Sequence, residues 1–367
     1  MTGYKAFIAW LFMAISVGAA GCGSGDGGGA QDSGNGTDTD TDTDTDTDTD
    51  TDTDTDTDTL MYDGGPYTPC EGDAGPGEIC IPGGKYLMGC MPYDPDCQPE
   101  EHPTVEVALS PFWIDEKEAT YASVLEWLNS KNGEYDFNIY GVSAFDQGEW
   151  KILFISFAPI VINGDGEMEW DYTPQEYECD DRDPEAAAGG LSWFGAELYC
   201  ESRGMRLPTE AEWEAAARGH TKMIWPCIWY HVPCQYGEYA ACFEWDECYD
   251  PYCEDCCLPF DDEYAGDCES PFGVRAMYGN AAEWVLDWQG EEGTDHSRCA
   301  GGCTDPPPAT GEIPIFKGGS ISGDYKETRI SSRTRDYNDV VTSAYEMTGV
   351  RCVRSPVSFD GSDGGSM

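Results

Sequence analysis

Two short helices with their own start and stop signals follow each other between Ser192 and Gly219, and they constrain the fold more than any other stretch. Ser192 is a suitable N-cap for the first helix, and Gly204 follows it as a C-terminal stop. The second helix begins after Thr209, which has capping-box spacing to Glu212, so that side chain and backbone of the two residues can bond reciprocally. These signals predict two consecutive helices but indicate no function.

The charge of the chain is strongly negative. Its 367 residues include 71 Asp and Glu against 19 Lys and Arg, for a net charge of −52. A Thr-Asp tract supplies 11 of the acids between Asp38 and Asp58, and the other 60 still outnumber the bases by 41. Such a surface repels nucleic acid and anionic lipid headgroups, and it favours solubility. We therefore expect no nucleic-acid partner.

Residues 1–22 have the anatomy of a bacterial signal peptide with a lipoprotein cleavage site. Lys5 precedes an apolar run that is short for a membrane span, and Ala19-Ala20-Gly21-Cys22 resembles a lipobox whose Cys thiol takes a diacylglyceryl group. The Leu that usually stands three residues before the Cys is absent, so ordinary secretion is the alternative. We expect a protein of the bacterial cell envelope, lipid-anchored to a membrane through Cys22 or extracellular.

Residues 23–59 consist almost entirely of Gly, Ser, Asp and Thr and cannot bury a core. Their alternating Asp charges repel one another and extend the chain. We predict a disordered tether that holds one folded domain, residues 60–358, off a membrane. Residues 359–367 are predicted to be a flexible tail.

Eighteen cysteines combined with a secretion signal indicate an oxidising compartment. Eight of them lie in residues 227–268, where Cys253-x-x-Cys256 would suggest zinc in a cytosolic protein. Here the secretion signal and a directly adjacent third cysteine favour disulfides. We predict a disulfide-stapled surface insertion and a candidate surface for a partner.

The string RLPTEAEWEAAARG at 206–219 closely resembles the signature of the sulfatase-modifying factor family, also called the formylglycine-generating enzyme family. Further stretches resemble the family's other motifs in its order: ICIPGGKYLMGC at 79–90, FWIDEKEAT at 112–120, PFGVRAMYGNAAEWVLDW at 271–288, FKGGS at 316–320, TRISSR at 328–333 and GVRCVR at 349–354. This resemblance implies the α+β formylglycine-generating-enzyme fold, which is related to C-type lectins and has little regular secondary structure.

The best-known activity of this family is oxidation of a sulfatase cysteine to formylglycine with copper and oxygen. Two cysteines, three and eight residues after the Ser of Gly-Gly-Ser, carry that chemistry. Counting from Ser320 gives Gly323 and Thr328, and neither can supply the thiolate that Cu(I) prefers. We therefore expect no catalytic cysteine, no copper, and loss of the oxidase activity.

The resemblance also implies a calcium site. Gly279, Ala281 and Glu283 match it, but Ala276 replaces an Asn, and a lost oxygen ligand lowers affinity for a hard cation. Two interpretations stay open: calcium is bound here, or Glu283 makes local hydrogen bonds next to Trp284.

Two disulfides are expected within the domain. Cys90 and Cys97 bracket a short Pro-rich loop, and we expect them to pair with each other. The resemblance implies a second bond between Cys200 and Cys352, which match positions that are bonded in some family members. It would tie the first helix to the last strand and contribute roughly 4 kcal/mol.

The four histidines show no ligand spacing typical of a single helix or hairpin; they are His102, His220, His231 and His296. His102, between Glu101 and Pro103, is predicted to be a surface loop residue.

Arg329, Arg333 and Arg335 alternate along a predicted strand and would share one face. They form either internal salt bridges with nearby acids or, together with Ser320, a site that binds an anion or a carboxylate in the former active-site groove.

Three functions follow from these observations. The first is a surface-anchored, monomeric module without oxidase activity that binds an unknown protein or envelope ligand. The second is an enzyme of the same family with different chemistry, for which Ser320 and the arginines are the only candidates and no general base is apparent. The third, retained formylglycine formation, would need a cysteine pair from residues 227–268 to reach the groove.

Overall fold

The computed structural model describes residues 61–131, 134–138, 141–146, 149–154, 160–163, 167–170, 184–226, 269–289, 296–320, 325–335 and 348–355. All of them belong to one compact unit that begins at Asp54. Outside the described residues lie the predicted signal peptide with Cys22, the tether, the insertion 227–268, Gly323 and the tail. Within the described residues, none of the helices has the length and apolar character needed to cross a membrane.

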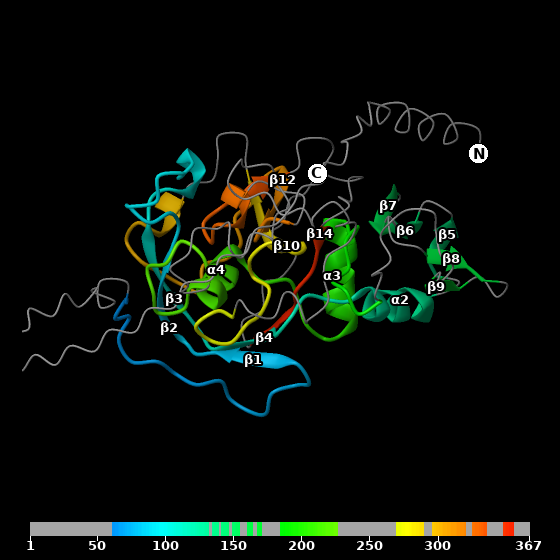
Figure 1. Cartoon of the computed structure of the whole chain (residues 1–367), viewed down its shortest axis with the longest axis horizontal. Coiled ribbons are helices and arrows are strands. Elements are labelled where there is room, and N and C mark those ends of the chain that lie inside the picture. The colour runs from blue at the N-terminus through cyan, green and yellow to red at the C-terminus, as the bar shows by residue number, and fades with distance from the viewer. Residues whose placement is uncertain are drawn as a thin grey trace, which may run out of the picture. The chain divides into compact units, whose positions relative to one another are not determined.

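The larger group of described elements contains three small sheets (Figure 1). The first is antiparallel and has the order β1 (Glu78–Ile81), β4 (Phe112–Asp115), β15 (Val353–Arg354). The second has the order β11 (Cys303–Thr304), β3 (Val105–Leu109), β2 (Gly84–Met88). The third has the order β13 (Thr334–Arg335), β12 (Ile313–Lys317), β10 (Ala282–Gln289), β14 (Thr348–Gly349).

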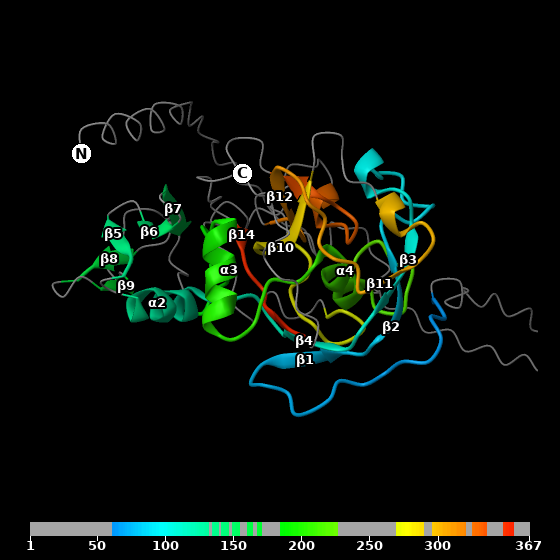
Figure 2. The same cartoon turned by 180° about the vertical axis from the view of Figure 1, so that it is seen from behind.

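A smaller group of elements lies at one end of the unit in both Figure 1 and Figure 2. It contains helix α2 (Tyr121–Ser130), the sheet β5 (Asp136–Asn138), β6 (Gly141–Asp146), β7 (Glu149–Phe154), and the pair β8 (Ile160–Ile162), β9 (Met168–Trp170). The described residues also contain three short 3₁₀ helices: η3 (Pro99–Glu101), η6 (His296–Cys299) and η7 (Tyr325–Thr328).

The two predicted central helices are confirmed as α3 (Trp193–Ser202) and α4 (Glu210–Arg218). The Ser192 hydroxyl caps α3 by accepting from the Gly195 N–H at 3.0 Å. Both hydrogen bonds of the Thr209–Glu212 capping box are present in α4. Every residue of α4 is buried, so this helix forms the centre of the domain.

Strand β10 separates two hydrophobic clusters. Trp284 packs with the residues around α3, whereas Val285 packs with those around α4. The indole N–H of Trp284 donates to the Leu191 carbonyl, and that of Trp193 donates to the Val285 carbonyl, both at 2.8 Å. Alternate side chains of β10 thus fix one helix on each side of the strand.

All eight cysteines in the described part of the chain are paired: Cys70–Cys80, Cys90–Cys97, Cys200–Cys352 and Cys299–Cys303. The second and third are the pairings expected from the sequence. The third closes a loop of 152 positions and joins α3 to the segment before β15.

The prediction of a strand that carries the three arginines is wrong for most of that segment. Helix η7 ends at Thr328, and the Ser332 N–H donates to the Arg329 carbonyl at 3.0 Å, which closes a turn. Only Thr334 and Arg335 form a strand. The chain turns here because Arg329 and Arg333 each reach a separate buried carboxylate.

Candidate functional site

The segment that follows β12 lies very close to helix α4 and to the end of η7. Gly318 and Gly319 both have positive φ, 86° and 66°. A Cβ at Gly318 would lie 3.2 Å from the Trp213 ring, and one at Gly319 would lie 2.9 Å from the Thr328 nitrogen. Two glycines are therefore required to bring β12 past α4 and against the end of η7.

Ser320 and Thr328, which lie on either side of the undescribed residues 321–324, are both buried. Thr328 forms a side-chain hydrogen bond with Tyr278. Burial raises the pKa of the Tyr278 phenol to about 12, so this hydroxyl stays protonated at neutral pH. Position 328 thus holds a hydroxyl that is already engaged within the domain.

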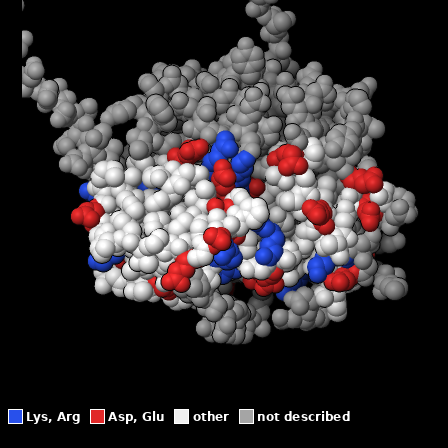
Figure 3. All heavy atoms as spheres, turned by 90° about the horizontal axis from the view of Figure 1, so that it is seen from below, with Lys and Arg blue, Asp and Glu red and all other residues white. Residues whose placement is uncertain are grey.

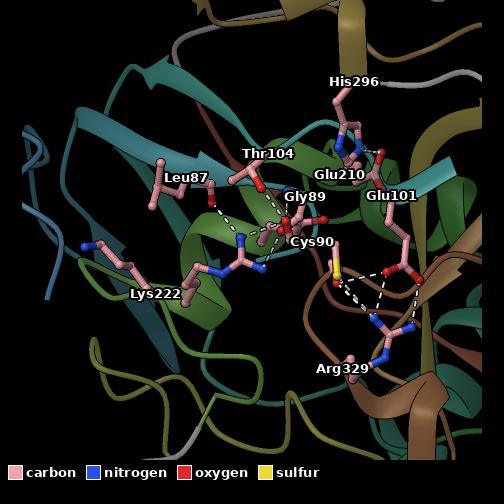
Figure 4. A network of polar contacts seen from close by, with 12 residues as sticks. Leu87, Gly89, Cys90, Glu101, Thr104, Glu210, Lys222, His296 and Arg329 are labelled. Atoms are coloured by element: carbon pink, nitrogen blue, oxygen red, sulfur yellow. Dashed lines mark hydrogen bonds and ion pairs between the residues drawn. The ribbon is translucent and has the colours of Figure 1, made fainter. Parts of the chain in front are cut away.

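Arg329 lies in a buried cluster of acids (Figure 4). Its guanidinium donates to both carboxylate oxygens of Glu101, at 2.7 and 2.8 Å, and to Asp94 at 2.9 Å. Its Nη1 also lies 3.7 Å from the Cys90 sulfur. The arginine is held by a bidentate ion pair rather than presented to solvent.

Arg333 makes a second buried ion pair, with Glu210 of α4. Its Nε donates to Glu210 Oε1 at 2.6 Å, and its Nη2 donates to the other oxygen. Lys317 lies 3.2 Å from Glu210 Oε1 and 2.9 Å from Glu214 Oε1. Burial alone would raise the pKa of Glu210, but Arg333 and Lys317 outweigh it and hold that pKa well below the usual range.

These contacts support the salt-bridge interpretation for two of the three arginines. Both Arg329 and Arg333 are buried and satisfied by carboxylates within the domain. For Arg335 only the backbone is described, and it pairs opposite Ile315. The described charges on the face shown in Figure 3 are also mixed, with basic side chains beside acidic ones.

His296 joins this centre, although sequence reasoning missed it. Together with Glu210 and Glu214 it forms a buried group of potential metal ligands. Its Nε2 lies 3.6 Å from Glu210 Oε2, and neither ring nitrogen has a hydrogen-bond partner among the residues that the structure describes. Lys317 and Arg333 already supply positive charge to these carboxylates, which disfavours an added divalent cation.

The only local signal for this group was the spacing of Glu210 and Glu214, which places both on one face of a helix. The histidine comes from η6, a distant part of the chain. By contrast, His102 is exposed, as expected for a surface loop.

Glu283 makes hydrogen bonds within the domain, but its partners come from distant segments rather than from residues next to Trp284. Arg351 donates to its carboxylate through Nε, at 3.1 and 3.0 Å, and through Nη2, at 2.8 Å. The Trp213 indole donates to it at 2.7 Å. The matched residues Gly279 and Ala281 lie in the turn before β10, and calcium binding there stays a prediction.

A second carboxyl, Glu118, shares Arg351 with Glu283. Its Oε1 accepts from the Asn280 amide at 3.0 Å, and its Oε2 lies 3.5 Å from Arg351 Nη2. Burial raises the pKa of Glu118 to about 7; Arg351 opposes the rise and Glu283 adds to it. The sequence did not single out Glu118, because its partners come from distant segments.

Comparisons with known proteins identify the family of this chain. Residues 67–356 match the family described as "Sulfatase-modifying factor enzyme 1-like domain". A formylglycine-generating enzyme of Thermomonospora curvata is 28% identical over 310 residues, which cover 77% of this chain and 94% of that protein. The inactive C-alpha-formylglycine-generating enzyme 2 of Mus musculus is 31% identical over 40% of this chain.

Some relatives are longer than the matched region. The chain spans 49% of the mouse protein and 37% of the serine/threonine-protein kinase pkn1 of Chlamydia caviae, to which it is 27% identical. Among solved structures, PvdO from Pseudomonas aeruginosa is similar in fold, with a TM-score of 0.50 and 17% identity over 76% of this chain and 93% of that one.

Proposed function

The chain belongs to the family of sulfatase-modifying factor enzyme 1-like domains, and from that premise we propose that it is an envelope-anchored binding module without formylglycine-generating activity. The lipid anchor is at Cys22, and the tether 23–59 carries the domain. The ligand is a protein or another component of the cell envelope.

One observation supports the proposed loss of oxidase activity. The position eight residues after Ser320 is a buried threonine, and the eight described cysteines are all in disulfides. The described residues thus offer no pair of free thiolates for a soft cation. The relative named as inactive in mouse is a precedent for such a scaffold without the oxidase activity.

The contacts of the described arginines indicate where on the domain a ligand could bind. Arg329 and Arg333 stabilise the domain from within, which leaves recognition to other surfaces. The insertion 227–268 is one candidate. Another is the pair Phe145 and Trp150, which lie opposite each other on β6 and β7 and are 61% and 45% exposed.

A direct test uses the mature chain with Cu(I), oxygen and a peptide that carries the Cys-x-Pro-x-Arg motif of sulfatases. Mass spectrometry should show an unchanged thiol. The variant Gly323→Cys/Thr328→Cys restores both thiol positions and should gain Cu(I) binding. An aldehyde produced by the unmodified chain would refute the proposal.

The binding role has its own test. Thermal unfolding of the mature chain is measured with soluble envelope glycans, with envelope protein extracts fractionated to single components, and with calcium. We expect one envelope component to raise the midpoint reproducibly and to bind in a saturable manner. If no component binds, the module proposal fails; if calcium alone stabilises the chain, the calcium interpretation of Glu283 is supported instead.

Anchoring is tested by Cys22→Ala in cells. The variant should move from the membrane fraction to the soluble fraction, and an unchanged distribution would exclude the lipid anchor.

A further inference from the structure

We propose that the Cys90–Cys97 disulfide is reducible and that the two thiolates released by reduction form, with the Asp94 carboxylate, a site for a thiolate-binding divalent cation such as Zn²⁺. The three side chains lie in one short loop between β2 and η3. Their potential ligand atoms all lie within 4.8 Å of one another. The binding state is the reduced one, because both sulfurs are bonded to each other in this structure.

The two sulfurs differ in access and in charge. Cys97 is partly exposed, whereas Cys90 is fully buried. An attacking thiolate therefore reaches the Cys97 sulfur, and Cys90 is the leaving group. Arg329 Nη1 lies 3.7 Å from the Cys90 sulfur (Figure 4) and stabilises the departing thiolate; the Asp94 carboxylate, 3.1 Å from the same sulfur, opposes this effect until a cation binds.

The reduction step needs a dithiol, either a small molecule or a protein. One thiolate of the dithiol attacks the Cys97 sulfur; the bond between Cys90 and Cys97 breaks, and Cys90 leaves with the electron pair. The second thiol of the reductant attacks the mixed disulfide and releases Cys97. Two electrons pass to the protein, and the dithiol becomes a disulfide. Cation binding then displaces the protons that remain on the two sulfurs.

The loop keeps its shape without the bond. The disulfide closes only seven positions, against 152 for Cys200–Cys352, so its loss frees less chain entropy in the unfolded state, about half as much. In the oxidised loop the Cys90 N–H donates to the Glu101 carbonyl at 3.0 Å and the Asp94 N–H to the Met91 carbonyl at 3.0 Å, and neither hydrogen bond involves the sulfurs. The three ligands therefore stay close together after reduction.

The donor set suits a soft cation. Thiolates favour such ions, and a zinc–sulfur bond of about 2.3 Å lets one ion join two sulfurs that have separated. The Asp94 carboxylate lies 3.1 Å from the Cys90 sulfur. Arg329 keeps its two bonds to Glu101 when Asp94 turns to the cation, so the guanidinium is not left unpaired.

Cd²⁺ is a suitable probe, because its bonds to thiolates absorb in the ultraviolet. The mature chain is reduced with dithiothreitol, freed of reductant without oxygen, and titrated. We expect the variant Cys90→Ser/Cys97→Ser to bind about one equivalent less than the unmodified chain. The control Cys299→Ser/Cys303→Ser removes another short-loop disulfide and should bind as the unmodified chain does. Equal binding by all three proteins overturns the proposal.

Asp94→Asn, reduced in the same way, tests the third ligand with both cysteines present. Its affinity for Cd²⁺ at this site should fall about tenfold or more. Alkylation and peptide mapping during a dithiothreitol titration test the order of reduction: Cys90 and Cys97 should be labelled before Cys200 and Cys352. The opposite order, or unchanged affinity in the Asp94 variant, contradicts the proposal.

Discussion

The Arg351 guanidinium donates three hydrogen bonds to the Glu283 carboxylate, and both side chains are fully buried. The pair joins the segment before β15 to β10 in the interior of the domain. Arg351 Nη1 also donates to the Asp115 carbonyl on β4 at 2.9 Å. One arginine thus holds three distant segments together.

Arg351→Met should destabilise the domain by about 3–5 kcal/mol, because it leaves Glu283 buried without its cation. Equilibrium unfolding in denaturant measures the loss. Arg354→Met is the matched control: this arginine pairs with Glu78 but is 40% exposed, so its loss should cost about 1 kcal/mol or less. Similar losses for both variants would show that burial of the Arg351 pair does not matter.

Glu118→Gln should change how stability depends on pH. The pKa of Glu118 rises from an ordinary value of 4.5 to about 7 in the folded state, so the folded protein binds the proton more tightly. The free energy of unfolding should therefore fall as the pH rises from about 4.5 to about 7, by about 3 kcal/mol at most. The Gln variant should lack this decline.

Chemical unfolding at several pH values measures this dependence. Glu126→Gln, an exposed position on α2, is the control and should leave the decline intact. A decline of the same size in the Glu118 variant would assign the effect to other groups.

Cys200→Ala/Cys352→Ala should lower the free energy of unfolding by about 4–5 kcal/mol, since the bond closes a loop of 152 positions. Cys299→Ala/Cys303→Ala opens a loop of four positions and should cost much less. Thermal unfolding of both variants without reductant gives the comparison, and equal losses would speak against the loop-length explanation.

Gly319→Ala should destabilise the domain by more than about 1 kcal/mol, because the residue has positive φ and an added Cβ meets the Thr328 nitrogen at 2.9 Å. Gly302→Ala separates these two causes: it has a φ of 86° but no atom within 4 Å of the added Cβ. The Gly319 variant should lose more stability than the Gly302 variant, as measured in denaturant. The reverse order would mean that the close approach to Thr328 is easily relieved.

Local signals in the sequence predicted what local contacts decide. Ser192, Thr209 and Glu212 form caps with residues three positions away, so α3 and α4 could be placed from the chain alone. The Cys200–Cys352 pairing came from a family resemblance, because nothing near either cysteine specifies a partner 152 positions distant. The family and its fold were identified through motifs, and the match over residues 67–356 confirms them.

Long-range ion pairs explain why some predictions from the sequence were wrong or incomplete. The spacing of Arg329 and Arg333 favoured a strand, but Glu101 and Glu210 draw the two side chains to separate buried sites across a turn. His296 and Glu118 were missed for the same reason: their charged neighbours lie on other elements. A periodic pattern records which side of an element is buried, not which distant charge will meet it there.

The pairing of β4 with both β1 and β15 affects the order in which the domain can assemble. Asp115, at the end of β4, accepts from the backbone N–H of Cys352, 237 positions later. The third strand of this sheet therefore reaches its place only when nearly the whole domain has left the ribosome. Contacts of such long range slow folding and leave the early strands open. The strands that come first in the chain therefore wait for the last one, and this sheet is completed late in synthesis.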